Sequence, residues 1–303
     1  MNELLFWVLF NFFVLAVLAV DLWVFHHPAH AVKFREAVIW SIGWILLAAA
    51  FAALVYFWRG RETAVEFTTG YVIELSLSVD NLFIFLLIFR YFRVPPDYQH
   101  KVLFWGIVGA LVMRGIFILV GIELIQKFHW IIFVFGAFLV YSGVRLLGKK
   151  EVGVDPEKNP MVRAFRRVIP VIDDYQGDRF LVRRAGLYAT PLLVVLIVVE
   201  TTDLLFATDS IPAVLAITLK PFVVYTSNVF AILGLRSLYF VLAGMMDVFH
   251  YLHYGLAVVL IFIGGKMLAS DYYSIPTLWA LGGVAGVLMI SMAASVARPK
   301  KEH

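Results

Sequence analysis

Long runs of apolar residues, separated by short polar stretches, dominate the chain. About 20 consecutive apolar residues are needed for a helix to cross a bilayer. The pattern therefore predicts about nine membrane-spanning helices, at residues 4–25, 37–58, 66–90, 101–121, 129–147, 187–209, 222–246, 251–269 and 276–297. The first run is longer than a signal-peptide core and lacks a basic segment before it, so we expect it to be retained as a span.

Composition supports this interpretation. Of the 303 residues, 62% are hydrophobic and only 15% are charged, which is more apolar than a soluble domain of this length. We expect an all-α polytopic membrane protein that forms a single transmembrane domain over residues 1–303 in the lipid bilayer. The sequence contains no cysteine, which excludes disulfides and thiolate metal sites.

The basic residues are distributed unevenly among the predicted loops. If the N-terminus is outside, the inside loops carry most of the lysines and arginines, above all the segment 148–186. The positive-inside rule therefore favours an outside N-terminus and a cytoplasmic C-terminus. Topology and attraction to anionic lipid account for the basic balance, so we expect no nucleic-acid partner.

Two parts of the chain resemble each other in sequence. Three blocks align in the same order, "SVDNLFIF" (78–85) with "ATDSIPAV" (207–214), "LVMRGIFILVG" (111–121) with "LGLRSLYFVLAG" (233–244), and "LVYSGVRLLG" (139–148) with "LIFIGGKMLA" (260–269). The alignment pairs Asp80 with Asp209, Arg114 with Arg236, and Arg145 with Lys266. Because each unit holds three predicted spans, the second is inverted relative to the first, as in many secondary transporters.

The repeats divide the chain into five parts. We expect helices 1 and 2 within residues 1–64, repeat one at 65–147, a cytoplasmic loop at 148–186, repeat two at 187–270, and the last helix and tail at 271–303.

Acidic residues lie within predicted spans of both repeats. The candidate ligands are oxygen donors: Glu74, Asp80, Asn81, Glu200, Asp203, Asp209 and Ser210. Each intramembrane carboxylate costs about 2.5–3.5 kcal/mol to insert, and the acids outnumber Arg114 and Arg236. We therefore expect a positive ion, either protons or a metal cation, to visit them. Pro212 predicts that the helix opens around Asp209, where freed carbonyls would complete a cation site.

The donor type narrows the metal. All eight histidines lie at predicted helix ends, in loops or in the tail. Carboxylate, amide and hydroxyl oxygens suit Mn²⁺, Mg²⁺ or Ca²⁺, and no organic cofactor is expected. Arg114 and Arg236 are predicted to balance charge, either when the metal leaves or as structural pairs. Ser78, Thr208 and Asp21 are further candidates along the pathway.

Three stretches carry a family resemblance. "TGYVIELSLSVDNLFIF", "VETTDLLFATDSIPAVLAIT" and "SNVFAILGLRSLYFVLAG" resemble the signature segments of the TerC family of integral membrane proteins, especially its Alx-like branch, and the likeness covers essentially the whole chain. It implies a bacterial inner-membrane protein linked to manganese export. It also implies that the acidic positions of residues 74–81 and 200–210 form the metal site.

Three functions from different classes are compatible with these features. The first is a divalent-cation exporter, favoured for Mn²⁺, that works by alternating access in exchange for protons. The second is a membrane scaffold or assembly factor that supplies metal to secreted or translocating proteins. The third is an intramembrane hydrolase with Asp80 and Asp209 as its dyad. The sequence lacks a GxGD element, and the extra polar groups beside each aspartate suit coordination better than a shared proton, so we expect a transporter and not an enzyme.

Overall fold

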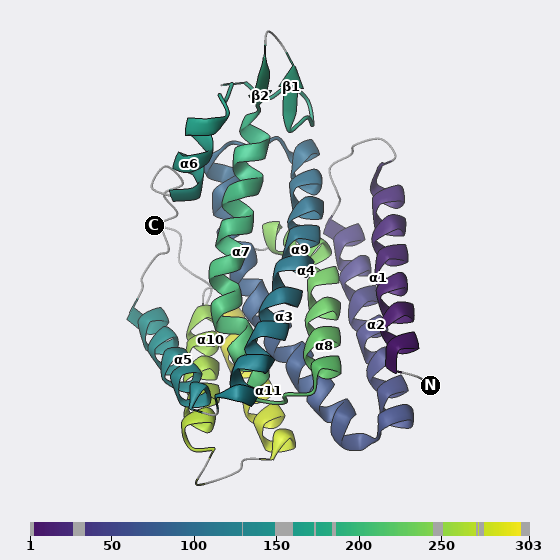
Figure 1. Cartoon of the computed structure of the whole chain (residues 1–303), viewed down its shortest axis with the longest axis vertical. Helices are drawn as coiled ribbons and strands as arrows, with labels where there is room; N and C mark the ends of the chain where they lie inside the picture. Colours follow the sequence, from purple (N-terminus) through teal and green to yellow (C-terminus); the bar gives the residue numbers. More distant parts are fainter. Residues whose placement is uncertain are drawn as a thin grey trace.

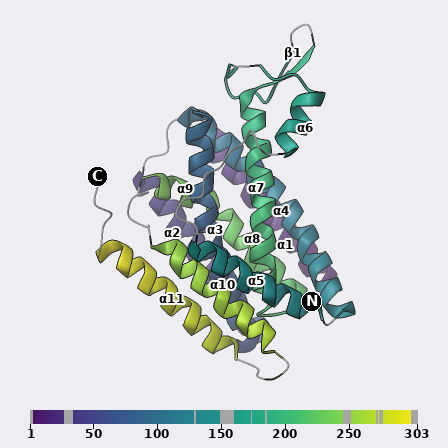
Figure 2. The same ribbon diagram turned by 90° about the vertical axis from the view of Figure 1, so that its left-hand side faces the viewer.

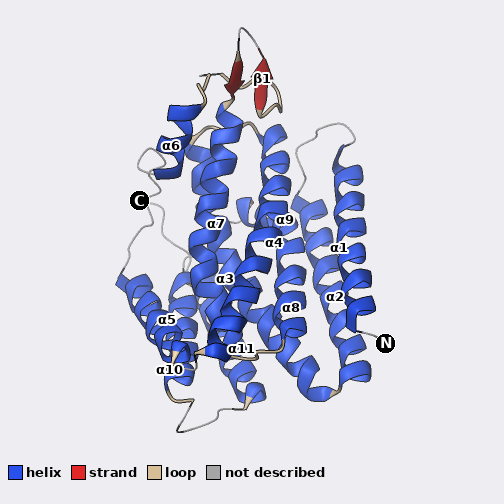
Figure 3. Cartoon of the chain, in the orientation of Figure 1, coloured by secondary structure: helices blue, strands red, loops and turns tan. Residues whose placement is uncertain are grey.

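The structure is a computed structural model that describes residues 3–26, 34–128, 130–148, 160–172, 174–183, 186–244, 251–270, 272 and 276–297. Helices make up nearly all of it, and one short β-hairpin lies at one end (Figure 3). The all-α class predicted from the sequence is confirmed.

The elements follow the order of the apolar runs. The first part of the chain forms α1 (Glu3–His26), α2 (Phe34–Arg59), α3 (Arg61–Tyr91), α4 (Pro96–Lys127) and α5 (Ile131–Gly148). The polar middle of the chain forms α6 (Pro160–Val168) and the antiparallel strands β1 (Leu181–Arg183) and β2 (Leu187–Ala189). The last part forms α7 (Pro191–Leu215), α8 (Pro221–Leu233), α9 (Leu235–Ala243), α10 (Leu252–Leu268) and α11 (Thr277–Ala297).

Helix α3 occupies the centre of the bundle. It packs against α2 on one side and against α7, α8, α9 and α11 on the others. Helix α5 packs along α10, and α11 covers α10, so that these three helices form one oblique layer (Figure 2). The start of α1 and the β-hairpin lie at opposite ends of the molecule (Figure 1).

The outer surface of the bundle is apolar. Large hydrophobic side chains such as Phe12, Phe57 and Ile290 are 71%, 85% and 71% exposed. A soluble protein rarely leaves so much apolar surface in contact with water, whereas a bilayer solvates it. Two clusters of buried apolar side chains fill the inside, and α3, α4 and α7 contribute to both or border them.

Each predicted apolar run contains a helix, but not every helix is long enough to cross a bilayer. Within the described residues, six helices meet the length and hydropathy expected of a span, and the bent pair α8–α9 makes a seventh. The apolar part of α1, Leu5–Val20, and all of α10 are shorter. The polytopic architecture is therefore confirmed, while nine spans, the inverted repeats and the five-part division stay predictions.

The predicted opening of the helix at Asp209 is wrong. Helix α7 begins at Pro191, because residues 187–189 form β2, and it continues through Pro212 to Leu215. Pro212 lies in the last turn, where it removes only one helical amide bond, and the residues around it are buried against neighbouring helices. The helix breaks instead at Gly234, where α8 and α9 meet at 41°, and glycine is a common cause of such a kink.

Candidate functional site

The acidic residues of both repeats lie on the two central helices α3 and α7, which pack against each other. Glu74 of α3 is fully buried, and Asp203 and Ser210 of α7 are 4% and 1% exposed. A hydrophobic face would be expected on helices at such depth. These polar residues therefore need partners inside the bundle.

Arg114 supplies one of these partners. This α4 side chain is completely buried, forms an ion pair with Glu74, and binds Asp203 through two parallel hydrogen bonds, Nε to Oδ2 at 3.2 Å and Nη2 to Oδ1 at 2.9 Å. Nη1 also donates to the Ser210 hydroxyl at 3.4 Å. Arg114 thus joins the acids of both predicted repeats. One guanidinium faces two carboxylates, so the group keeps a net negative charge when both are ionised.

Three buried polar side chains form a row on α3: Glu74, Ser78 and Asn81, called here the α3 polar row. They are spaced by four and three residues, so they lie on one face of the helix. Oε2 of Glu74, Oγ of Ser78 and Nδ2 of Asn81 have no hydrogen-bond partner among the described residues. Native structures rarely bury such groups without a partner, so the row marks a place where a polar guest fits.

A cavity of about 140 Å³ continues from this row. It lies between α3, α5, α7 and α10, and its polar lining consists of Asn81, Ser142, Arg145 and Asp209. The Ser142 hydroxyl donates to Oδ1 of Asp209 at 2.8 Å. The cavity, called here the bundle cavity, has room for several water molecules and presents a carboxylate, an amide and a hydroxyl, which are oxygen ligands for a hard cation.

Glu200 lies one turn before Asp203 on α7 and is held close to α4. A Cβ atom at Gly109 would overlap the Glu200 carboxylate, so a larger residue there would displace this side chain from its present position. Oε2 of Glu200 is buried and has no hydrogen-bond partner among the described residues. Arg236, directly after the α8–α9 break, is 4% exposed and shares a cavity of about 20 Å³ with Asp203.

The structure does not gather all predicted ligands in one place. No group of three or more His, Cys, Asp or Glu side chains suited to a metal occurs within the described part of the chain. The Thr208 hydroxyl donates to the Leu205 carbonyl at 2.6 Å, within its own helix. The side chains of Asp21 and Asp80 lie outside the described residues, so the pathway role of Asp21 and the aspartate dyad stay predictions.

Sequence reasoning missed Ser142 and Arg145 as cavity residues. Both lie in the repeat block of residues 139–148, where the sequence indicates Arg145 only as the repeat counterpart of Lys266. Ser142 gave no signal, because one hydroxyl in an apolar run is common and only the packing of α5 beside α7 brings it to Asp209.

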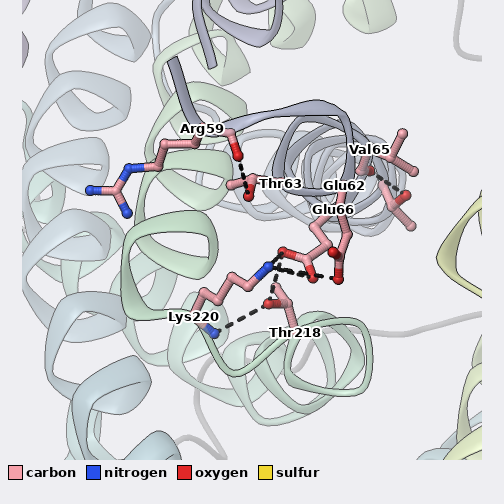
Figure 4. Close-up of polar contacts among 8 residues, drawn as sticks. Arg59, Glu62, Thr63, Val65, Glu66, Thr218 and Lys220 are labelled. Carbon is pink, nitrogen blue, oxygen red and sulfur yellow. Dashed lines mark hydrogen bonds and ion pairs between the residues drawn. The ribbon is translucent and has the colours of Figure 1, made fainter. Parts of the chain in front are cut away.

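A second polar group, also missed, lies at the start of α3, at the end of the bundle opposite the β-hairpin (Figure 1), and Figure 4 shows its contacts. Nζ of Lys220 lies 3.1 Å from the Glu66 carboxylate and 3.9 Å from that of Glu62. The Thr218 hydroxyl donates to Glu66 at 3.2 Å. These four residues, called here the Lys220 cluster, tie the start of α3 to the connection between α7 and α8. Glu66 is 6% exposed, whereas the Lys220 side chain is 47% exposed, so the contact lies at the boundary between the bundle interior and its surface.

The β-hairpin segment docks on the other end of the bundle. The Tyr175 hydroxyl donates to the Phe92 carbonyl at 2.8 Å, and Lys101 forms an ion pair with Asp178 at 2.8 Å. Burial raises the pKa of Tyr175 to about 12. The hydrogen bond from Lys101 lowers the pKa of Asp178 below its usual value. The predicted loop at residues 148–186 is thus partly ordered.

Comparison with known proteins identifies relatives along nearly the whole chain. It is 48% identical over 295 residues to the uncharacterized membrane protein STKORF319 of Myxococcus xanthus, covering 97% of this chain and 92% of that protein. It is 47% identical over 298 residues to a Salmonella typhi protein provisionally named membrane-bound redox modulator Alx, covering 95% and 92%. An uncharacterized membrane protein of Rickettsia bellii is 37% identical over 293 residues, covering 96% and 97%.

No solved structure matches the chain. Residues 59–303 match the integral membrane protein TerC family. The matched region contains α3 to α11 and therefore both acidic helices. The resemblance noted in the three signature stretches is confirmed. The chain belongs to the TerC family of integral membrane proteins.

Proposed function

We propose that this protein transports a divalent metal cation, with Mn²⁺ as its preferred substrate, along the α3 polar row and the bundle cavity. The α3 polar row carries this proposal, because Glu74 and Ser78 bury oxygen atoms that have no hydrogen-bond partner among the described residues. A hydrated cation bound beside these oxygen atoms offsets the cost of burying them.

The chemistry of the donors supports a hard cation. Asp209, Asn81 and Ser142 present oxygen atoms to the bundle cavity, and oxygen ligands suit Mn²⁺, Mg²⁺ and Ca²⁺. The 303 residues include no cysteine. This chain is similar to relatives named redox modulators but has no thiol of its own. We propose a transporter and assign the chain no enzymatic activity.

The transport cycle that we propose depends on which positive charge lies beside the buried carboxylates: the metal cation, Arg114 or protons. Arg114 pairs with Glu74 and Asp203 and balances one of their two negative charges, and a cation bound to the same carboxylates competes with it. Protons can replace the metal on carboxylates in a low-dielectric setting, so we propose export in exchange for protons. We place the chain in the bacterial inner membrane with its N-terminus outside, so that the β-hairpin end is cytoplasmic.

Flux through proteoliposomes tests the proposal. Purified protein is reconstituted, and Mn²⁺ flux is measured with and without a pH gradient, beside Mg²⁺, Ca²⁺ and Zn²⁺. Asp209→Asn should abolish the flux, because it removes the ligand charge of the bundle cavity at nearly constant volume. Glu123→Gln is the matched control, since Glu123 pairs with Lys127 on the exposed surface of α4.

Two results would contradict the proposal. Wild-type Mn²⁺ flux in Asp209→Asn would remove the bundle cavity from the pathway. Bound Mn²⁺ without flux under any gradient would replace transport by the scaffold alternative, in which the protein supplies metal to other proteins.

A further inference from the structure

Helices α5 and α10 pack closely at two glycine contacts that are related by the repeat alignment. A Cβ atom on Gly136 would lie 3.0 Å from the Gly264 carbonyl, and a Cβ atom on Gly143 would lie 2.7 Å from the Ala257 carbonyl. The alignment that pairs Arg145 with Lys266 also pairs Gly143 with Gly264 and Gly136 with Ala257. The two close contacts are therefore exchanged by the repeat relation, as expected when an inverted pair of helices packs around its own symmetry axis.

The bundle cavity does not follow this symmetry. Its lining on α5 comes from the last two turns of that helix, where Ser142 and Leu146 are half-buried and Arg145 is exposed. Their repeat counterparts on the last turns of α10 are closed: Ile263 is fully buried, Met267 is 3% exposed and Lys266 is half-buried. The end of α5 therefore borders a cavity, whereas the equivalent end of α10 is filled by packed side chains.

Two residues of the cavity lining are counterparts of each other in the repeat alignment. Leu77 of α3 and Phe206 of α7, which line the bundle cavity, are each other's counterparts in the alignment of the first repeat block. The equivalent cavity would share these two side chains. The difference between the two places thus lies in the ends of α5 and α10 and not in these two side chains.

The closed place lies toward the end of the bundle held by the Lys220 cluster. Helices α5 and α10 are repeat counterparts and run antiparallel, so α10 ends at the same end of the bundle where α5 begins (Figure 1). Helix α7 reaches that end at Leu215. The ion pair between Lys220 and Glu66 fastens α3 to the α7–α8 connection at this end (Figure 4).

From these contacts we infer that a second vestibule for the hydrated cation forms on the side opposite the β-hairpin, lined by Ser210, Ile263, Lys266 and Met267, when the bundle cavity closes. These residues are the counterparts of Asn81, Ser142, Arg145 and Leu146. The inference rests on the proposed transport function and names the residues that the cation meets on its way out. The structure then represents the state that is open toward the β-hairpin side.

Single-cysteine labelling tests this directly, because the sequence has no cysteine of its own. Leu146→Cys and its counterpart Met267→Cys are exposed to a membrane-impermeant maleimide in right-side-out and in inverted vesicles, with and without Mn²⁺. Leu146→Cys should react from the β-hairpin side and Met267→Cys from the opposite side, and Mn²⁺ should change the two rates several-fold in opposite directions. Leu288→Cys on α11 is the control, because Leu288 is a buried apolar residue that lines neither the bundle cavity nor the proposed vestibule, and it should stay unreactive.

The inference is overturned if Met267→Cys stays as unreactive as Leu288→Cys in every condition, or if both labelling rates change in the same direction. Ile263→Cys replaces Met267→Cys if the latter variant does not fold. Mn²⁺ flux is measured on the same preparations. Opposite changes in labelling without flux would support the two vestibules and contradict the transport function, whereas flux without a reactive Met267→Cys would do the reverse.

Discussion

Arg114 is completely buried, yet it pairs with two carboxylates from different helices. Burying three charges is expensive, and their mutual attraction repays the cost only when the hydrogen-bond geometry is good. The parallel bonds to Asp203 meet this condition. At the scale of the residue, the candidate site is therefore organised around a cation that belongs to the protein.

Arg114→Gln should destabilise the protein by about 3–5 kcal/mol, because it leaves buried charge without compensation. Arg114→Lys should recover only part of this loss, since an ammonium group lacks the planar fork that binds Asp203 twice. Thermal unfolding in detergent measures both. Lys127→Gln, on an exposed surface pair, is the control and should shift stability by less than about 1 kcal/mol; an equal loss in both variants would contradict the prediction.

Among the elements, the α5–α10 pair depends on glycine more than any sequence pattern indicates. Gly143→Ala should destabilise the protein by about 1–3 kcal/mol, because its Cβ meets the backbone of Ala257, which cannot move aside. Gly265→Ala is matched to it, since nothing lies within 4 Å of a Cβ there, and it should be neutral or slightly stabilising. The free energy of unfolding is measured for both variants. A loss of stability in Gly265→Ala but not in Gly143→Ala would contradict the close packing at Gly143.

The Lys220 cluster fixes one end of α3. Lys220→Met removes the positive partner of buried Glu66 and keeps the apolar stem, so we expect the contact between α3 and the α7–α8 connection to loosen. Hydrogen exchange in residues 216–222 should rise at least several-fold relative to Lys127→Met, which changes an exposed lysine of similar length. Unchanged exchange would mean that apolar packing alone holds this end.

The β-hairpin segment should respond to pH through Asp178. The pKa of Asp178 is lowered in the folded protein, so its contribution to docking is present above the unfolded pKa of about 4 and is lost as the pH falls through that range. Because Asp178 is 54% exposed, the contribution is below about 1 kcal/mol. Limited proteolysis near residues 174–183 should therefore increase in Asp178→Asn at neutral pH, but not in Asp174→Asn, and low pH should remove the difference.

Considered as a whole, the molecule shows where sequence reasoning succeeds in a membrane protein. Within the described residues, each helix long and apolar enough for a span overlaps a predicted apolar run, because a bilayer requires continuous hydrophobic length. The acids on α3 and α7 were identifiable for the same reason, since a carboxylate at that depth contrasts with its neighbours. The side-chain partners were not identifiable: the bonds from Arg114 to Asp203 and from Ser142 to Asp209 depend on which helices pack together.

The error at Pro212 has a similar origin. Sequence alone indicates that proline removes an amide bond, but not how near the helix end lies or how tightly neighbours hold it. Helix α7 ends three residues later at Leu215, so the missing bond has little effect. The break that the structure does contain lies between α8 and α9 at Gly234, and no proline at that position indicates it in the sequence.

The pairing of Glu74 with Arg114 also bears on how the chain is made. These residues lie on consecutive helices, α3 and α4, so the pair is available before α7 has been synthesised, since chains fold from the N-terminus as they emerge. If α3 and α4 enter the bilayer as a hairpin, each charge brings its own neutraliser and the insertion cost of about 2.5–3.5 kcal/mol per group is reduced. Asp203 arrives later and finds its cation already in place.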